Sequence, residues 1–326
     1  MQNRILFFSG GLSSFAVAHH LKETYPKDNI VLCFTDTLWE DEDLYRFIDE
    51  VSTKLKLPLL KHSSGIDPVE LMIKQKIIFN SRMGNCSSIL KMKVASDYLK
   101  KGKKPTNETW YNKQFLKNEN FIENAILYFG ISFDEFHRTK AISENWKPFE
   151  VEFPLCKMYF DYDELLSQYN IKKPRLYIYG FTHNNCKGRC VKSGKGHYKL
   201  LYNEDLETFN QVNEIEHYLS LFVGDYHLTK KNSSDEEWKM AQHYLEQNEI
   251  EMHRWHDSGY QYKPNLIYGS IENYPSILKS THLNQLKKSL DNKMTLDLFG
   301  EEIGGCGCFI EYEQEESNGF SKPTDD

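Results

Sequence analysis

The chain lacks a hydrophobic run long enough to cross a membrane and lacks an excess of positive charge. No apolar stretch in its 326 residues approaches the roughly 20 residues that a membrane helix needs, so we expect no membrane partner. The formal net charge is -7 at pH 7, which argues against a broad electrostatic grip on nucleic acid and leaves room only for a local basic groove. Residues 1–4 lead directly into a strand-like segment, and we therefore predict no signal peptide.

The sequence also lacks internal repeats and an even set of cysteines. Seven cysteines in a chain without an export signal predict thiols or metal ligands in the reducing cytoplasm. The 20 Tyr, the 20 Phe and a hydrophobic content of 40% argue against disorder. This composition predicts one large globular domain or two of ordinary size.

Short apolar runs alternate with helical patterns over the first two thirds of the chain. Strands are predicted at residues 4–8, 29–35, 58–62, 125–131 and 149–155. Helices are predicted from residue 14 and over residues 41–55, 69–79 and 87–100. This alternation predicts an α/β fold with a mostly parallel sheet. A polar stretch at residues 102–117 interrupts the pattern, and the later chain has a helical pattern that ends in a polar tail.

A glycine-rich turn, Ser-Gly-Gly-Leu-Ser-Ser at residues 9–14, joins the first strand to the first helix. Backbone N–H groups exposed in such a turn, together with the positive end of the helix dipole, form a phosphate cradle. The alternative is an ordinary turn in which Ser13 or Ser14 is the helix N-cap. No Gly-Lys-Ser/Thr follows, which excludes the Walker motif.

The turn resembles the pyrophosphate-binding loop of the PP-loop ATP pyrophosphatases and the phosphoadenosine phosphosulfate (PAPS) reductases, with Ser13 in place of the usual Asp. The resemblance extends over residues 4–201 and implies a Rossmann-like sheet of the adenine nucleotide alpha hydrolase type. It implies a nucleotide-binding domain at residues 1–204 and a mainly helical region at residues 205–326. The PAPS-reductase-like branch includes many phage and mobile-element proteins. The resemblance assigns the nucleotide phosphates to Ser9, Gly10, Gly11, Leu12, Ser13 and Ser14.

Three further segments resemble motifs of the same superfamily. Residues 34–51 resemble its second motif, which places Thr35 and Asp36 near the adenosine, although Asp36 could equally cap a turn. Residues 82–99 contain Cys86 followed by Lys91, and Lys91 and Arg82 would reach a phosphate or sulfate. Residues 128–142 match at Gly130, Glu135 and Arg138, with Arg138 as phosphate ligand; the alternative is a surface ion pair.

The densest match lies at residues 174–201, which resemble a C-terminal signature of PAPS-reductase-like proteins. Flexible glycines alternate here with five cations, and Lys192 belongs to the signature. This composition suits an anionic ligand, either a nucleotide phosphate or a polynucleotide, and the alternative is a solvated basic loop. The other cations are Lys187, Arg189, Lys195 and Lys199.

Two close cysteine pairs, Cys186 with Cys190 and Cys306 with Cys308, predict a four-thiolate metal site. Zinc is the default ion, and an iron–sulfur cluster, which occurs in some relatives, uses the same ligands. His183 and His197 are possible substitutes for one cysteine. The alternatives are unrelated thiols or a Cys-x-Cys redox pair. Cys33 and Cys156 are predicted to be structural.

The resemblance implies an enzyme that uses ATP and Mg²⁺. It would cleave ATP to AMP and pyrophosphate and adenylate an acceptor, either a nucleic-acid base or a small metabolite, with Arg138, Lys91 and Lys192 as catalytic residues. A PAPS-type sulfonucleotide reductase is a second interpretation, although Gly-Gly-Cys-Gly-Cys at residues 304–308 departs from the Glu-Cys-Gly-x-His of that family. A third is a nucleotide-sensing or partner-binding module of a phage or defence system, without turnover.

Overall fold

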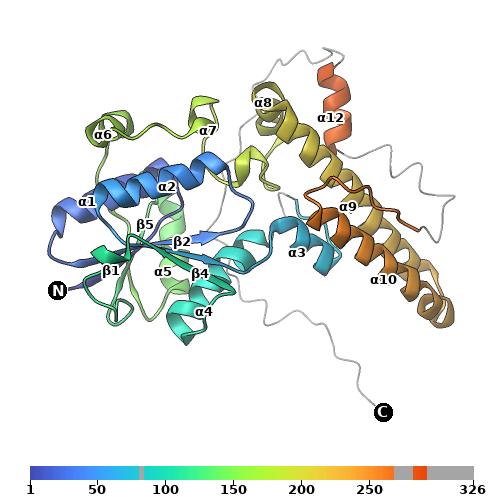
Figure 1. Ribbon diagram of the computed structural model, residues 1–326, viewed down its shortest axis with the longest axis horizontal. Coiled ribbons are helices and arrows are strands. Elements are labelled where there is room, and N and C mark those ends of the chain that lie inside the picture. The colour runs from blue at the N-terminus through green and yellow to red at the C-terminus, as the bar shows by residue number, and fades with distance from the viewer. Residues whose placement is uncertain (81–83, 268–281, 292–326) are drawn as a thin grey trace.

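The computed structural model describes residues 1–80, 84–267 and 282–291 of the chain, and it is organised around one six-stranded sheet (Figure 1). The strand order is β4-β3-β2-β1-β5-β6. All neighbouring strands are parallel except β4, which pairs antiparallel with β3. The predicted α/β fold with a mostly parallel sheet is thus confirmed. The strands are β1 (Asn3–Phe7), β2 (Asn29–Asp36), β3 (Leu59–Ser63), β4 (Asn107–Tyr111), β5 (Ile126–Phe129) and β6 (Glu150–Glu152).

Helices cover both faces of the sheet because alternate strand residues point to opposite sides. Leu6 of β1 packs into one core with α1 (Leu12–Thr24), α2 (Glu42–Leu55) and α6 (Tyr162–Tyr169). Ile5 and Phe7 pack into a second core on the other face. Figure 1 shows α1 and α2 above the sheet and α4 below it. The second face is covered by the π-helix η1 (Ser87–Lys93), α4 (Val94–Lys101) and α5 (Thr139–Asn145).

The helix α2 shows how the local sequence determines where a helix begins, where it ends and which face it buries. Its buried residues recur at helical spacing, as an amphipathic helix requires. The side chain of Asp41 accepts a hydrogen bond from the N–H of Asp43 at 2.7 Å and caps the N-terminus. Lys56 ends the helix in the left-handed conformation, with φ at 53°. The buried residues are Leu44, Phe47, Ile48, Val51, Ser52 and Leu55.

The structure differs from the sequence-based expectation in the polar stretch at residues 102–117, which contains the edge strand β4. Four of its five residues are exposed and the fifth is half-buried. An edge strand that buries neither face has no alternating apolar pattern, so its sequence reads as a loop. The register of β4 is set by its pairing with β3, where Leu60 lies opposite Trp110.

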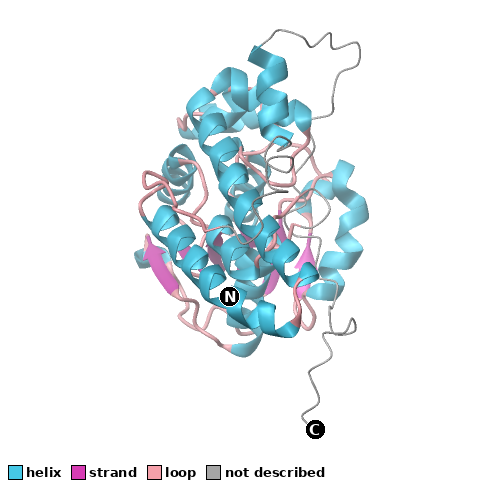
Figure 2. Cartoon of the chain, turned by 90° about the vertical axis from the view of Figure 1, so that its right-hand side faces the viewer, coloured by secondary structure: helices cyan, strands magenta, loops and turns pink. Residues whose placement is uncertain are grey.

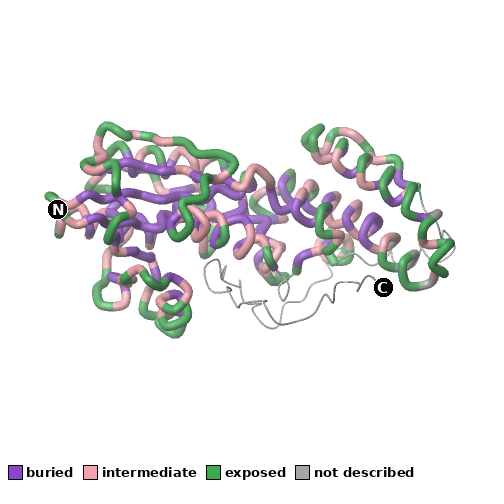
Figure 3. The backbone as a smooth tube through the Cα atoms, turned by 90° about the horizontal axis from the view of Figure 1, so that it is seen from below, coloured by how far each residue is buried: buried purple, intermediate pink, exposed green. Residues whose placement is uncertain are grey.

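The later chain is helical. Its two longest helices pack on α3 (Pro68–Gln75), and its two shorter helices pack on the first of these long helices and on each other. A third core joins Trp39 and Met72 to Phe222 and Trp255. Figure 2 shows the strands enclosed by helices, and in Figure 3 the strands are mostly buried whereas the long helices alternate between buried and exposed residues. The helices are α8 (Lys195–Glu204), α9 (Leu206–Asn232), α10 (Asp235–Asp257) and α12 (His282–Asp291).

Several short elements connect these layers. The elements α7 (Arg175–Ile178) and η5 (Cys186–Gly188) and the 3-10 helices η3 (Phe133–Arg138) and η4 (Pro154–Cys156) belong to the part of the chain that forms the candidate site. The 3-10 helix η2 (Lys113–Phe115) lies at the opposite end of the sheet, because β4 before it runs antiparallel to β3. Within the described ranges, none of the helices is both long and apolar enough to cross a membrane.

One ion pair links α10 to the N-terminus of α3. The Nε2 atom of His256 lies 2.9 Å from Oδ2 of Asp67, which also caps α3. Burial lowers the pKa of His256, but the hydrogen bond and the charge of Asp67 outweigh burial and raise it to about 9. A raised pKa means that the pair stabilises the fold fully below the ordinary His pKa and loses this contribution as the pH rises toward 9.

We therefore expect the free energy of unfolding to fall by about 1 kcal/mol between pH 6.5 and 9, a value discounted for the partial solvent access of the pair. Urea denaturation of the wild type and of His256→Gln at several pH values measures the contribution of this ion pair to the free energy of unfolding. His253→Gln, one turn earlier on α10, is the control and should keep the wild-type pH profile. Identical profiles for wild type and His256→Gln would refute the assignment.

Candidate functional site

The candidate site lies where the strand order reverses. The chain runs outward from β1 through β2 to β3 and then returns to β5 on the other side of β1. In open α/β sheets this switch point leaves a crevice at the carboxyl ends of the strands, and ligands bind there. The loop at residues 9–14 follows β1, and Gly130 follows β5, so both belong to this crevice.

The loop after β1 ends in an uncapped helix N-terminus. Gly11 is the N-cap of α1 and supplies no side-chain hydrogen bond, and the first turn carries no acidic residue. The hydroxyl of Ser14 donates to the carbonyl of Gly11 at 2.9 Å, so neither Ser13 nor Ser14 is the N-cap. Gly10 has φ at +77°, and a Cβ there would lie 2.8 Å from Cγ of Leu44. Among the described residues, the N–H of Leu12 donates to the hydroxyl of Tyr177, and the N–H groups of Ser13 and Ser14 remain available to an anion.

Gly130 lets the loop after β5 touch the loop after β1. A Cβ at position 130 would lie 2.9 Å from the backbone nitrogen of Ser14 and 3.0 Å from the carbonyl carbon of Ser13. Any side chain here would displace the start of α1, because the obstructing atoms are backbone. The predicted role of Gly130 in nucleotide binding stays a prediction.

Arg138 ends the 3-10 helix η3 at the same edge of the sheet. Its side chain is 6% exposed and pairs with Glu135, so an exposed surface ion pair does not describe it. Its Nε atom is buried and has no hydrogen-bond partner among the described residues. A buried guanidinium with an unsatisfied N–H is uncommon in folded proteins and calls for an additional acceptor, such as a ligand oxygen.

Three residues that the sequence did not single out contact the loop directly. The N–H of Leu12 donates to the hydroxyl of Tyr177 at 3.3 Å, and the Ser13 and Tyr162 hydroxyls lie 3.2 Å apart. Burial raises the pKa of Tyr177 to about 12, so its hydroxyl stays neutral. Asn184 donates to the carbonyl of Gly10 at 3.0 Å. The Asn-Asn-Cys part of the signature at residues 174–201 was the available signal for Asn184, whereas nothing local marks the tyrosines.

Asp36 at the end of β2 already has partners within the protein. Its buried carboxylate accepts hydrogen bonds from the N–H of Leu38 and the hydroxyl of Tyr45, both at 2.8 Å. Lys61 pairs with it at 2.7 Å. The bond to Leu38, two residues later, is the turn contact expected of an Asp after a strand. The role of Thr35 and Asp36 near an adenosine stays a prediction.

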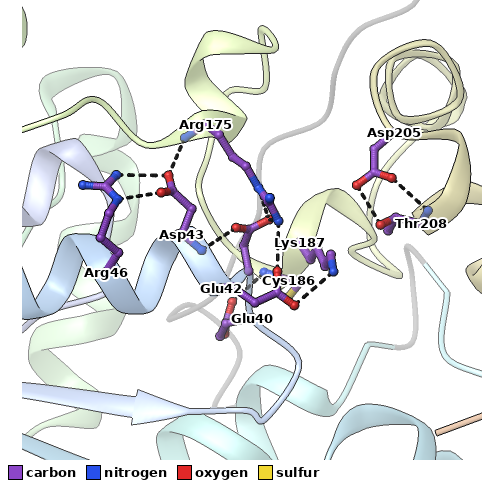
Figure 4. Close-up of polar contacts among 10 residues, drawn as sticks. Glu40, Glu42, Asp43, Arg46, Arg175, Cys186, Lys187, Asp205 and Thr208 are labelled. Carbon is purple, nitrogen blue, oxygen red and sulfur yellow. Dashed lines mark hydrogen bonds and ion pairs between the residues drawn. The ribbon is translucent and has the colours of Figure 1, made fainter.

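Glu40 binds three segments through one buried carboxylate. Its Oε1 accepts from the hydroxyl of Thr37 at 2.9 Å and pairs with Nζ of Lys91 at 3.0 Å. Its Oε2 accepts from the N–H of Cys186 at 2.5 Å, as Figure 4 shows. Burial lowers the pKa of Lys91, but Glu40 and nearby sulfurs outweigh burial and raise it above its ordinary value. Lys91 is therefore a permanent cation that is already paired with a carboxylate.

A charged network holds the segment at residues 174–201 against the start of α2 (Figure 4). The guanidinium of Arg175 binds Asp41 at 2.8 Å, and its backbone N–H donates to Asp43 at 2.7 Å. Lys187 pairs with Glu42 at 3.1 Å. These pairs tie α7 and η5 to α2, so Lys187 is not a free member of a basic loop.

Two other predicted cations of this segment, Arg189 and Lys192, also contact residues elsewhere in the chain. Arg189 is buried, stacks on the ring of Trp39 at 3.4 Å and donates to Gln211 at 2.6 Å. Lys192 lies against Gly84, where a Cβ would be 2.2 Å from its Cε. The signature is therefore a packed segment of the site rather than a solvated basic loop.

Cys186 and Cys190 lie in contact in this segment. Both are buried, and a hydrogen bond joins the two sulfurs. Cys86 lies close to Cys190. Cys306 and Cys308 lie outside the described residues, so the four-thiolate site stays a prediction. Within the described ranges, no three His, Cys, Asp or Glu side chains are arranged to hold a metal ion.

Two other cysteines are structural, as expected. Cys33 belongs to the second core, and burial raises its pKa to about 12. The thiol of Cys156 donates to the carbonyl of Ile131 at 3.4 Å. His183 and His197 stack with ring centroids 5.4 Å apart, and both have a lowered pKa because they are buried.

Comparison with known proteins identifies the part of the chain that carries the loop. Residues 3–109, from β1 into β4, match the family model of the phosphoadenosine phosphosulfate reductase domain. The match spans about a third of the chain, and Gly130, Arg138 and residues 174–201 lie beyond it. A search of curated proteins finds no match. The N-terminal α/β part of the chain is thus similar to the phosphoadenosine phosphosulfate reductase domain, and this match supports the PAPS-reductase-like branch of the PP-loop superfamily.

Proposed function

We propose that this protein binds ATP at the loop of residues 9–14 and cleaves it between the α and β phosphates, transferring AMP to an acceptor and releasing pyrophosphate. The observation that carries the proposal is the uncapped N-terminus of α1 at the switch point of the sheet. Its N–H groups and dipole favour a phosphate. The family match supports nucleotide binding by the same part of the chain.

Catalysis in this proposal is mainly electrostatic. Arg138 approaches the phosphates from the β5 side, and the loop N–H groups bind them from the β1 side. Asp36 and Glu40 are already paired with Lys61 and Lys91, so we expect Mg²⁺ to arrive with the nucleotide rather than at these carboxylates. When bound, Mg²⁺ neutralises charge on the phosphates. Lys91 acts as a positioning residue through Glu40, and Lys192 is the further cation that we assign to the phosphates.

The surroundings favour a small acceptor over a polynucleotide. A polar cavity of about 530 Å³ opens between α2, α7 and α9. Its carboxylates outnumber its cations, Arg175 and Lys187, and both cations are paired with Glu42. A phosphate backbone would be repelled here, whereas an amide or amine metabolite would find hydrogen-bond partners. The carboxylates are those of Glu42, Asp205, Glu207 and Glu214.

Sulfonucleotide reduction is the second candidate, because thiols lie next to the loop. Cys186 follows Asn184, which binds Gly10, and the N–H of Cys186 is held by Glu40. A thiol that attacks a sulfonucleotide must lie beside the bound nucleotide. The described cysteines are free thiols, which supports our placement of the protein in the reducing cytoplasm.

Incubation with Mg²⁺ and α-labelled ATP, with and without a metabolite extract or tRNA, tests the proposed reaction. We expect labelled AMP or an AMP adduct with matching pyrophosphate, and stimulation by the metabolite extract. Parallel incubation with PAPS and a dithiol reductant tests the second candidate, which predicts sulfite, adenosine bisphosphate and an equal amount of oxidised dithiol. Intact ATP in every mixture would refute ATP cleavage.

Replacement of Arg138 tests the phosphate site by binding alone. We expect Arg138→Ala to weaken the affinity for α,β-methylene ATP by at least about 10-fold, or about 1.4 kcal/mol, because a charge-assisted hydrogen bond to phosphate is lost. Isothermal titration calorimetry measures this affinity. Arg254→Ala is the matched control, since Arg254 also pairs with a Glu three residues earlier but is exposed on α10. Equal affinities for both variants would remove Arg138 from the site.

A further inference from the structure

We propose that Cys186 and Cys190 form a dithiol site that reacts with small disulfides and closes to a reversible Cys186–Cys190 disulfide. Five free cysteines lie in the described part of the chain, and these are the two whose sulfurs share a hydrogen bond. The proposal rests on the geometry of this pair. It does not depend on which nucleotide reaction the protein catalyses.

The backbone between the two cysteines is folded in an unusual way. Cys186, Lys187 and Gly188 all have left-handed φ angles, of 58°, 51° and 71°. For the two non-glycine residues this conformation is unfavourable, because it brings Cβ close to the following carbonyl oxygen. Strain of this kind persists only where surrounding contacts enforce it, and it concentrates at functional sites. Here it curls the segment so that two sulfurs four positions apart in the sequence come into contact.

Contacts on both sides of the curl enforce it. Glu40 accepts the N–H of Cys186, and Lys187 pairs with Glu42. On the other side, His197 is hydrogen-bonded to the carbonyl of Gly188 at 2.7 Å, and the hydroxyl of Tyr198 donates to the carbonyl of Cys190 at 3.0 Å. The reduced pair is thus held close together before any oxidation. This arrangement lowers the entropic cost of closing a disulfide.

The charge around Cys190 suits the attacking sulfur of a thiol exchange. The ammonium of Lys91 lies near Cys190, and a backbone N–H donated by Lys192 reaches its sulfur. Positive charge and N–H donors stabilise the negative sulfur that attacks a disulfide. The carboxylate of Glu40 lies near Cys186, so we assign Cys186 the second step, in which the intramolecular disulfide closes.

The proposed exchange is balanced in electrons and protons. The sulfur of Cys190 attacks one sulfur of a small disulfide, forms a mixed disulfide and releases one thiol. The sulfur of Cys186 then attacks Cys190, closes the intramolecular disulfide and releases the second thiol. Two electrons and two protons pass from the cysteine pair to the substrate. Because Cys186 and Cys190 are only 8% and 4% exposed, we expect a preference for small disulfides over protein disulfides.

Equilibration of the full chain in buffers of reduced and oxidised dithiothreitol, followed by alkylation and tryptic mass mapping, tests the proposal. Trypsin cleaves after Lys187 and Arg189, so a Cys186–Cys190 disulfide joins two separate peptides. We expect this linked pair to appear in a single two-electron transition and to disappear on reduction. The variant Cys190→Ser should abolish it, and Cys156→Ser, at a thiol outside the pair, should retain it.

Two results would overturn the proposal, and both are read from the wild type. The first is alkylation of Cys186 and Cys190 as free thiols across the whole range of buffers. The second is a disulfide from either residue to Cys86, Cys306 or Cys308 in place of the expected pair. Tightly bound zinc would block alkylation of both thiols until it is chelated. If both residues are alkylated as free thiols only after chelation, that form of the first result would instead support the four-thiolate site. Neither result bears on ATP cleavage, which is tested separately.

Discussion

The buried carboxylate of Glu40 joins the segments on which the candidate site depends. Without its partners this charge would be very costly to bury, since desolvation of an ion in the protein interior costs several kcal/mol. Thr37, Lys91 and the N–H of Cys186 supply those partners. They come from the residue after β2, from the π-helix η1 and from the segment at residues 174–201. The requirement to satisfy one charge thus fixes three distant parts of the chain at the carboxyl edge of the sheet.

The nucleotide loop is held by a second set of contacts that converge on the same edge. Gly130 allows the β5 loop to reach the backbone of Ser13 and Ser14, and Asn184 binds the carbonyl of Gly10. Asn184 lies two residues before Cys186, so the segment that contacts the loop also carries the thiol pair. The proposed phosphate site and the proposed dithiol site therefore belong to one connected structure. The helices α9 and α10 pack on α3. The core around Trp39 and Trp255 joins these helices to the cysteine pair.

Much of the fold was predictable because it depends on local patterns. The buried strands β1 and β2 are continuous apolar runs, and α2 has a clear helical spacing with an Asp cap. The loop at residues 9–14 was recognisable because glycine serves a specific conformational purpose there. The edge strand β4 was missed because neither of its faces is buried.

The partners of the site residues could not be predicted, because they depend on contacts between distant segments. Nothing near Asp36 in the sequence indicates that Lys61 pairs with it, and nothing near Arg189 indicates that it stacks on Trp39. Cys86 and Cys190 are about a hundred residues apart in the sequence, and they come close because both pack in the core around Trp39 and Trp255. Residue types and motifs predicted which residues belong to the candidate site. Tertiary packing determines which of their side chains are already paired within the protein.

The most direct test of the central claim is a crystal structure of the full chain with Mg²⁺ and α,β-methylene ATP. We expect the phosphates at the N-terminus of α1, between the loops that follow β1 and β5, with the guanidinium of Arg138 within hydrogen-bond distance of a phosphate oxygen. A nucleotide bound elsewhere, or phosphates that contact neither the loop of residues 9–14 nor Arg138, would contradict the proposed site.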